Sequence, residues 1–295
     1  DYSSLDRVRD IISNINFKKN NLLLKKEKSN PKYSFKDFFS SFDISNMTNY
    51  NMLDVIACIV DSSTFSEFKQ NYGKTILCGI ANISGYTVGI VANQKKTVKT
   101  ADGKIQLGGV VYNDSADKAA RFIMNCNQDK IPIIFIHDVN GFMVGKDSEF
   151  SGIAKDGAKM VNAVSNSTVP KITIIIGGSY GAGNYAMSGK AYSPSFIYAW
   201  PTASIAVMGG EQAAKTLYEI KISKMKNLSD DEKENIYKKI KNKYKAQSDI
   251  KYGAARIWVD DIINPEETRF VITRSLDLIN NRTEIKEPSY GVMQV

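Results

Sequence analysis

From residue 75 to residue 213, apolar residues fall alternately in short continuous runs and in segments with a helical period. Short apolar, β-branched runs bounded by turn residues are typical of buried strands, and a 3.6-residue period is typical of amphipathic helices. The predicted strands are 75–83, 86–92, 133–136, 172–176, 196–200 and 204–207. The predicted helices are 115–126 with Ser115 as its cap, 153–164, and one that begins within 208–213. This alternation predicts an α/β fold in which crossovers join layers of strands and helices.

The pattern is weaker before residue 75. A helix is predicted from Leu5 to Ile15, and a polar stretch rich in lysine and asparagine follows it up to residue 50. Helical periodicity returns from Met52 to Val60 and is broken by the polar residues 61–63, while 95–107 predicts an exposed hairpin or loop. We therefore expect a helix and interdomain connector over 1–50 and a folded domain over 51–295.

The stretch KITIIIGGSYGAGNYAMSG, residues 171–189, carries the strongest chemical signal. Its strand ends in a glycine-rich turn, 177–183, after which a helix can begin at Asn184. Glycine allows a sharp turn and a close approach to a ligand, and the first N–H groups of a helix can bind an anion. The turn therefore predicts a backbone oxyanion hole, with a tight turn that has no chemistry as the alternative. A second glycine-bearing loop, 138–145, also follows a strand, where α/β sheets bind ligands.

Nucleotide-binding and hydrolase interpretations of the glycine turn fit less well. No Gly-Lys-Ser/Thr and no G-x-G-x-x-G follows the strand. Residues 177–181 match the G-x-S-x-G elbow of serine hydrolases, but that arrangement requires a histidine after Ser179. The only histidine, His137, precedes the serine, and we expect it to have a structural or rim position. With no carboxylate pair or metal-ligand cluster in view, backbone stabilisation of a developing oxyanion is the chemistry that remains.

Composition narrows the class of protein without identifying it. A chain of 295 residues with 43% hydrophobic content can bury a sizeable core. It has no run of about 18 apolar residues that would cross a membrane. The three cysteines lie in apolar or mixed stretches without CxxC spacing, so we expect reduced, buried thiols in a reducing compartment, the cytoplasm or a mitochondrial matrix. Because the chain begins with Asp1, we expect it to be part of a longer protein.

The net charge of +8 does not by itself indicate a nucleic-acid partner. The lysines concentrate in 18–28 and in 221–245, and the second segment interleaves acidic residues with helical spacing. Ser229 is placed to cap a helix there, before three acidic residues. A solvated helical face is the expected structure, with no nucleic-acid or membrane partner.

Four blocks of the sequence resemble the carboxyl-terminal domain of the carboxyltransferase (β) subunits of biotin-dependent acyl-CoA carboxylases. The blocks are GFMVGKDSEFSGIAKDGAKMVNAV (141–164), VPKITIIIGGSYGAGNYAMSGKAYSP (169–194), AWPTASIAVMGGEQAA (199–214) and AARIWVDDIINPEETR (254–269). Within them, GFMVG, GGSYGAGNY and MGGEQAA look most like methylcrotonyl-CoA carboxylase. Residues 103–122 favour no branch, which keeps a propionyl-CoA type open.

The resemblance implies a crotonase-like (ClpP/crotonase) ββα superhelix and transfer of carboxylate from carboxybiotin, held on a carrier protein, to an acyl-CoA. It implies no metal. At the matching positions, the backbone N–H groups of Ala182 and Gly183 would hold the biotin ureido oxygen. Further residues implied at the biotin site are Gly141 and Phe142 in the adjacent loop, Gly157 and Ala158 in a nearby helix, and Tyr180 and Gly181 in the turn.

Family subunits contain two homologous crotonase-like domains, and this chain resembles only the second. The resemblance therefore implies three partners: a biotin carboxylase with its biotin carrier, the amino-terminal domain of a neighbouring subunit, and further copies in a homo-oligomer. We expect this chain to supply the biotin half of the site and to be inactive alone. The alternatives are a subunit of a biotin-dependent decarboxylase of the glutaconyl-CoA type and a non-catalytic assembly domain.

Overall fold

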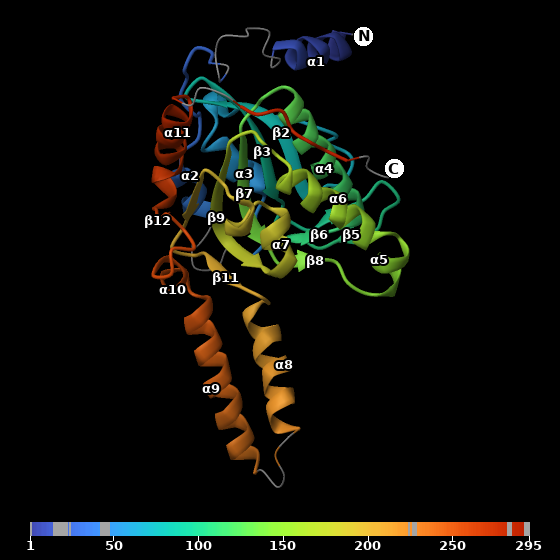
Figure 1. The fold of residues 1–295 in the computed structure, drawn as a ribbon, viewed down its shortest axis with the longest axis vertical. Helices are drawn as coiled ribbons and strands as arrows, with labels where there is room; N and C mark the ends of the chain where they lie inside the picture. Colours follow the sequence, from blue (N-terminus) through green and yellow to red (C-terminus); the bar gives the residue numbers. More distant parts are fainter. Residues whose placement is uncertain are drawn as a thin grey trace.

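A computed structural model of the chain describes residues 2–13, 23, 25–41, 48–223, 225, 229–281 and 285–291. Its centre is an eight-stranded mixed sheet (Figure 1). The strands are β1 (Ser66–Glu67), β2 (Ile76–Ile83), β3 (Tyr86–Asn93), β7 (Ile133–Val139), β9 (Lys171–Tyr180), β10 (Phe196–Ala199), β11 (Ser204–Ala206) and β12 (Asp261–Ile262). They run in the order β1-β2-β3-β7-β9-β10-β12, and β11 pairs with the end of β9. The first three strands pair antiparallel, and all pairs from β3 onwards are parallel.

Helices cover both faces of this sheet. They are α1 (Tyr2–Ser13), α2 (Phe35–Ser41), α3 (Met52–Ala57), α4 (Asn113–Gln128), α5 (Lys146–Phe150), α6 (Ile153–Ser165), α7 (Gly181–Ala186), α8 (Gly210–Ile222), α9 (Asp230–Ser248), α10 (Ile250–Ala254) and α11 (Thr268–Ile279). Short 3₁₀ turns lie at η2 (Asp61–Ser63), η3 (Lys190–Tyr192) and η4 (Pro265–Glu267). Alternate residues of β7 belong to two different apolar clusters, one packed on α4 and α6 and the other on α2, α3 and α11. Burial on both faces explains the continuous apolar runs in the sequence.

Most predicted elements are present, with three instructive differences. The strand predicted to end at Ile176 continues through Gly177 and Gly178 to Tyr180, because backbone pairing with β7 and β11 does not depend on side chains. Ser115 is not the N-cap of its helix: it lies in the first turn of α4, where its hydroxyl accepts from the N–H of Tyr112 at 2.9 Å. The short helix α5, directly after the predicted loop 138–145, was not predicted.

Two small sheets flank the main one. β4 (Val98–Lys99) and β5 (Ile105–Gln106) form the antiparallel hairpin expected within 95–107. β6 (Val110–Val111) pairs in parallel with β8 (Gly141–Phe142), which places the second glycine-bearing loop beside the main sheet.

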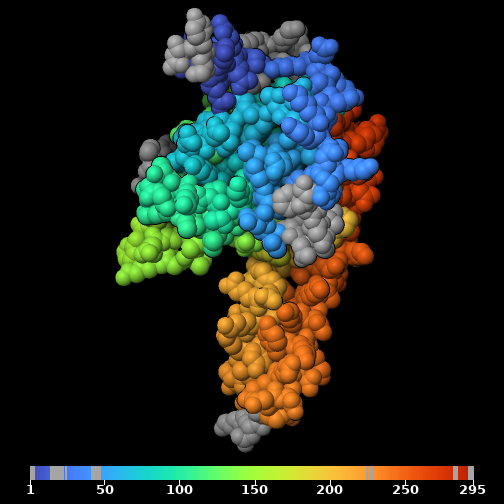
Figure 2. Space-filling model, turned by 180° about the vertical axis from the view of Figure 1, so that it is seen from behind, coloured from blue at the N-terminus to red at the C-terminus, as the bar shows by residue number. Residues whose placement is uncertain are grey.

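Helices α8 and α9 form an arm that projects from the body of the molecule (Figures 1 and 2). The Ser229 cap is confirmed: its hydroxyl accepts from the N–H of Glu232 at 3.2 Å, and the Glu232 carboxylate accepts from the N–H of Ser229 at 2.9 Å. Tyr218 and Tyr237 pack edge to face across the two helices, with ring centroids 5.5 Å apart. Among the helices that the described residues form, none has the length and apolar character required to cross a bilayer.

Part of the expected connector packs into the core. The Phe35 and Phe38 rings of α2 are buried, and Phe35 lies edge to face against the fully buried Trp200 at 5.4 Å. Helix α1 confirms the predicted amino-terminal helix as far as Ser13, whereas most of the lysine segment 18–28 lies outside the described residues. The domain boundary at residue 50 stays a prediction.

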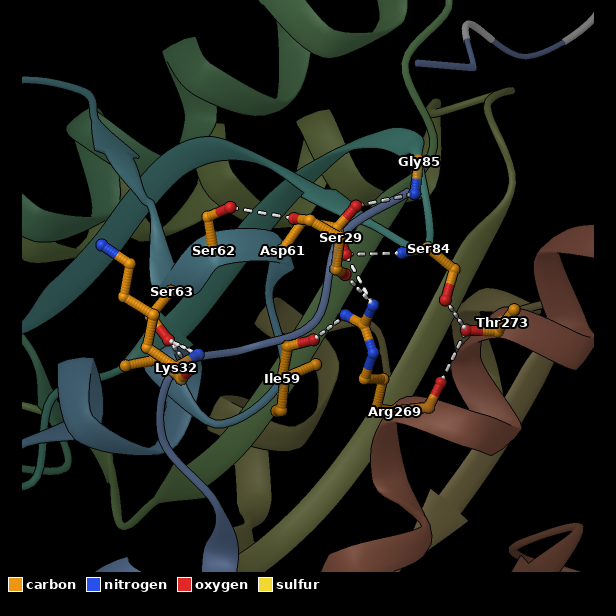
Figure 3. A network of polar contacts seen from close by, with 11 residues as sticks. Ser29, Lys32, Ile59, Asp61, Ser62, Ser63, Ser84, Gly85, Arg269 and Thr273 are labelled. Atoms are coloured by element: carbon orange, nitrogen blue, oxygen red, sulfur yellow. Dashed lines mark hydrogen bonds and ion pairs between the residues drawn. The ribbon is translucent and has the colours of Figure 1, made fainter. Parts of the chain in front are cut away.

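A polar network ties residues 25–32 to the body at Asp61 (Figure 3). The buried Asp61 carboxylate accepts from the N–H groups of Ser84 and Gly85 at 2.9 and 2.7 Å and pairs with Arg269 of α11 at 2.6 Å. Arg269 also donates to the carbonyl of Ser29 at 2.7 Å. All three cysteines, Cys58, Cys78 and Cys126, are buried free thiols, as expected.

Candidate active site

The predicted oxyanion turn lies where β9 passes directly into α7. Tyr180 is the N-cap residue, and within the described chain its side chain does not cap the helix. Ala182 and Gly183 are therefore the second and third residues of α7, whose N–H groups have no intrahelical acceptor. Gly181 has φ +50°, a left-handed conformation that favours glycine, and a Cβ there would lie 2.8 Å from the carbonyl oxygen of Val207. The turn thus presents adjacent backbone N–H groups in the first turn of α7, which begins at Gly181 and not at the predicted Asn184.

The second glycine-bearing loop lies against this turn. A Cβ on Gly183 would lie 2.6 Å from Cγ2 of Val139 and 3.3 Å from Cα of Gly141. Gly157 of α6 approaches the neighbouring ring in the same way, since its Cβ would lie 2.9 Å from Cε1 of Phe142. The structure therefore brings Gly141, Phe142, Gly157 and Gly183 together from three separate elements.

The other predicted site residues are placed less directly. Tyr180 turns its ring back over Gly178, where a Cβ would lie 2.6 Å from the ring. Ala158 is exposed, and it lies about 100° around α6 from the buried Gly157, so it does not share the contact with Phe142. A cavity of about 390 Å³ adjoins the turn on the side of Gly181 and is lined by Tyr185, Lys190 and Trp258 among others.

Ser179 and His137 form a buried pair that the chain order did not predict. The serine hydroxyl lies 2.9 Å from Nδ1 of His137, and Nε2 of the ring contacts the carbonyl of Met187. Asn184 donates to the same hydroxyl at 2.8 Å. Both residues are 0% exposed, and burial lowers the pKa of His137 to about 4, so the ring is neutral at pH 7. Because no substrate can reach this hydroxyl, the pair is a structural contact and not a hydrolase site.

A second buried cluster, centred on Asp138, was missed in the sequence. Its carboxylate pairs with Lys95 Nζ at 2.7 Å and accepts from the Tyr50 hydroxyl at 2.9 Å and from the N–H of Gly178 at 2.9 Å. Burial and the Asp138 charge raise the pKa of Tyr50 well above its usual value, so the phenol remains a donor. Its three partners lie 43, 88 and 40 residues away along the chain, which local patterns do not connect.

Comparison with known proteins assigns the chain to a family. Residues 1–291 match the family described as the carboxyl transferase domain. The chain is 43% identical over 295 residues to the methylcrotonoyl-CoA carboxylase beta chain, mitochondrial, of Dictyostelium discoideum, an alignment covering 99% of this chain and 48% of that protein. It is 42% identical over 269 residues to the biotin-dependent 3-methylcrotonyl-coenzyme A carboxylase beta1 subunit of Mycobacterium tuberculosis, covering 90% of this chain and 48% of that protein.

Solved structures agree on the fold. The beta subunit of geranyl-CoA carboxylase from P. aeruginosa superposes with a TM-score of 0.75 at 35% identity, covering 92% of this chain and 50% of that chain. Transcarboxylase 12S superposes with a TM-score of 0.81 at 28% identity, covering 98% and 53%. The predicted crotonase-like α/β fold is confirmed.

The chain spans about half the length of the curated relatives it matches. The family match nevertheless extends over almost the whole of this chain. The chain belongs to the carboxyl transferase domain family.

Proposed function

We propose that the chain is the carboxyltransferase component of a biotin-dependent acyl-CoA carboxylase of the methylcrotonyl-CoA type. The relatives from Dictyostelium discoideum and Mycobacterium tuberculosis are named for that activity, at 43% and 42% identity. The observation that supports the proposal best is the uncapped first turn of α7, which presents the Ala182 and Gly183 amides next to Gly141.

The residues of this chain fit the biotin half of the site. Two adjacent N–H groups suit a single oxygen that gains negative charge, such as the ureido oxygen of biotin. Among the described residues, no atom would lie within 4 Å of a Cβ on Gly141, so this part of the chain leaves open space beside the amides. Carboxybiotin, when bound, supplies the carboxyl group. The chain's own part is to hold that oxygen at Ala182 and Gly183, with Phe142 as an apolar wall braced by Gly157.

The rest of the reaction requires partners. We infer that an amino-terminal carboxyltransferase domain from a neighbouring subunit supplies the CoA half, that a biotin carboxylase with its carrier delivers the carboxyl group, and that the assembly is an oligomer. The half-length match to the relatives supports this division, and transcarboxylase 12S is described as a hexamer.

The test is carboxyl transfer by this chain, with and without a separately supplied amino-terminal domain. The assay contains biotinylated carrier, biotin carboxylase, ATP and bicarbonate, and compares methylcrotonyl-, propionyl- and acetyl-CoA. We expect transfer only with the added domain, and fastest to methylcrotonyl-CoA. Transfer by the chain alone would contradict the half-site assignment, and no transfer to any acyl-CoA by a folded complex would contradict the function.

A further inference from the structure

The Asp138 cluster lies at the joint between the two glycine-bearing loops. Asp138 precedes Val139, which packs on Gly183, and it faces the stretch of β9 that leads into the turn. The register of the two strands shifts at this point: His137 pairs with Ile175 and Val139 with Ser179, so one residue of β7 faces three of β9. The β9 backbone bulges around the Asp138 side chain.

The carboxylate fills the space inside that bulge. A Cβ on Gly177 would lie 2.5 Å from Cγ of Asp138, and the next residue, Gly178, donates its N–H to Oδ1 at 2.9 Å. The same oxygen accepts from Lys95 at 2.7 Å, and Tyr50 holds Oδ2. Asp138 is 3% exposed, so these contacts stand in a low-dielectric interior where charge-assisted hydrogen bonds are strong.

We propose that Asp138 is a positioning residue for the oxyanion turn, and that Lys95 and Tyr50 hold its carboxylate against the β9 bulge. A short stretch of chain connects the bulge to the two amides: the bulge ends at Gly178, and Ala182 and Gly183 follow four and five residues later. A change in the bulge therefore shifts the two amides relative to Gly141. This inference rests on the proposed carboxyltransferase function, because it assigns a use to the position of those amides.

The chain contains a matched control for this experiment. Asp61 is also a buried carboxylate, 7% exposed, that accepts from backbone N–H groups and pairs with one cation, Arg269 (Figure 3). Asp61 belongs to η2 and its carboxylate contacts the β2–β3 turn at Ser84 and Gly85, whereas Asp138 lies where the parallel strand β7 ends. Loss of charge at either position removes a buried ion pair, but only Asp138 contacts the bulge that leads to the oxyanion turn.

The test compares Asp138→Asn with Asp61→Asn in the assembled carboxylase, with methylcrotonyl-CoA as acceptor. For D138N we expect kcat, per folded enzyme, to fall roughly 10- to 100-fold, as misplacement of reacting groups does, with the KM for methylcrotonyl-CoA little changed. Amide hydrogen exchange of the peptide 172–187 should be faster in D138N than in the wild type. D61N should unfold more easily but keep the wild-type kcat and the wild-type exchange of that peptide.

Equal slowing of kcat by the two variants, or a wild-type kcat in folded D138N, would overturn the inference. If D138N does not fold, Lys95→Met replaces it in the test, because this variant keeps the Asp138 carboxylate. An unchanged kcat together with unchanged hydrogen exchange of 172–187 in this variant would also overturn the inference. Inactivity of the wild-type complex would instead contradict the proposed function, so the two failures are distinguishable.

Discussion

His137 shows how a single buried ring links the fold to pH. Its pKa is lowered from 6.5 to about 4 by burial, so the unfolded chain binds a proton between these values that the folded chain does not. Stability is therefore lost as the pH falls through this window, by about 3 kcal/mol over its full width. Since the chain has one histidine, the effect belongs to one residue.

Urea unfolding at several pH values from 7 to 4.5 measures this dependence in the wild type and in His137→Asn. The variant is expected to be less stable than the wild type at pH 7, because it disturbs the contact with Ser179. As the pH falls, its free energy of unfolding is expected to decrease less than that of the wild type. The comparison is needed because burial raises the carboxyl pKa of Glu67 and Asp129, which acts in the opposite direction. If the free energy of unfolding depends on pH in the same way in the two proteins, the assignment of this dependence to His137 is contradicted.

A substitution at Gly183 tests the oxyanion turn by the addition of a single methyl group. Gly183→Ala places a methyl group 2.6 Å from Cγ2 of Val139, a buried and stiff β-branched side chain, so the turn must shift. We expect kcat for carboxyl transfer to fall about 100-fold or more, comparable to the loss of one oxyanion donor. The control is Gly291→Ala, whose added methyl meets no atom of the described residues within 4 Å. Wild-type kcat in G183A would remove the turn from the proposed site.

At the scale of elements, periodicity in the sequence was a good guide wherever an element has a buried face. Helix α6 and strands β2, β3 and β7 begin within a residue of their predicted positions. The prediction ended strand β9 too early because glycine is typical of turns, although a central strand needs only its backbone to pair. Helix α5 has no buried residue and therefore left no apolar pattern.

The candidate site likewise has one part that the sequence predicts and one part that it does not. The glycine turns, the free amides and the adjacent loop follow from local sequence, because they are backbone features of consecutive residues. The Asp138 cluster and the Ser179–His137 pair do not, since tertiary packing alone brings together polar groups 40 to 88 residues apart. Long-range polar contacts of this kind have no local signature.

The arm offers a test of one helix end. Ser229→Ala removes the capping box of α9 and is expected to destabilise that helix by about 1 kcal/mol. Hydrogen exchange within 230–248 should accelerate, whereas exchange in β7 should not, because α9 lies in the arm and β7 lies in the central sheet of the body (Figure 1). Ser223→Ala, at the end of α8, removes only an exposed contact to a carbonyl and serves as the control. Equal acceleration in both variants would argue against the cap.

For the whole molecule, the core extends into the stretch expected to be a connector. Deletion of residues 1–44 removes Phe35 and Phe38 from Trp200 and Tyr50, and loss of one buried phenylalanine typically costs 3–5 kcal/mol. We therefore expect a deletion of 1–44 to destabilise the chain by at least about 3 kcal/mol, and a deletion of 1–22, which retains α2, to destabilise it less. Urea unfolding followed by tryptophan fluorescence measures both, and equal stability of the two would place the boundary at residue 50.

The arm also has a mechanical consequence. Its base is fixed beside the oxyanion turn: β11 pairs with Tyr180, the Val207 carbonyl lies over Gly181, and Tyr244 of α9 donates to the Met208 carbonyl at 2.8 Å. With 19 residues, α9 is a rod about 28 Å long, so a tilt of about 10° moves its tip by about 5 Å while the base shifts far less. A tilt of the arm therefore acts on the chain at Tyr180 and Gly181, the two residues that directly precede Ala182 and Gly183.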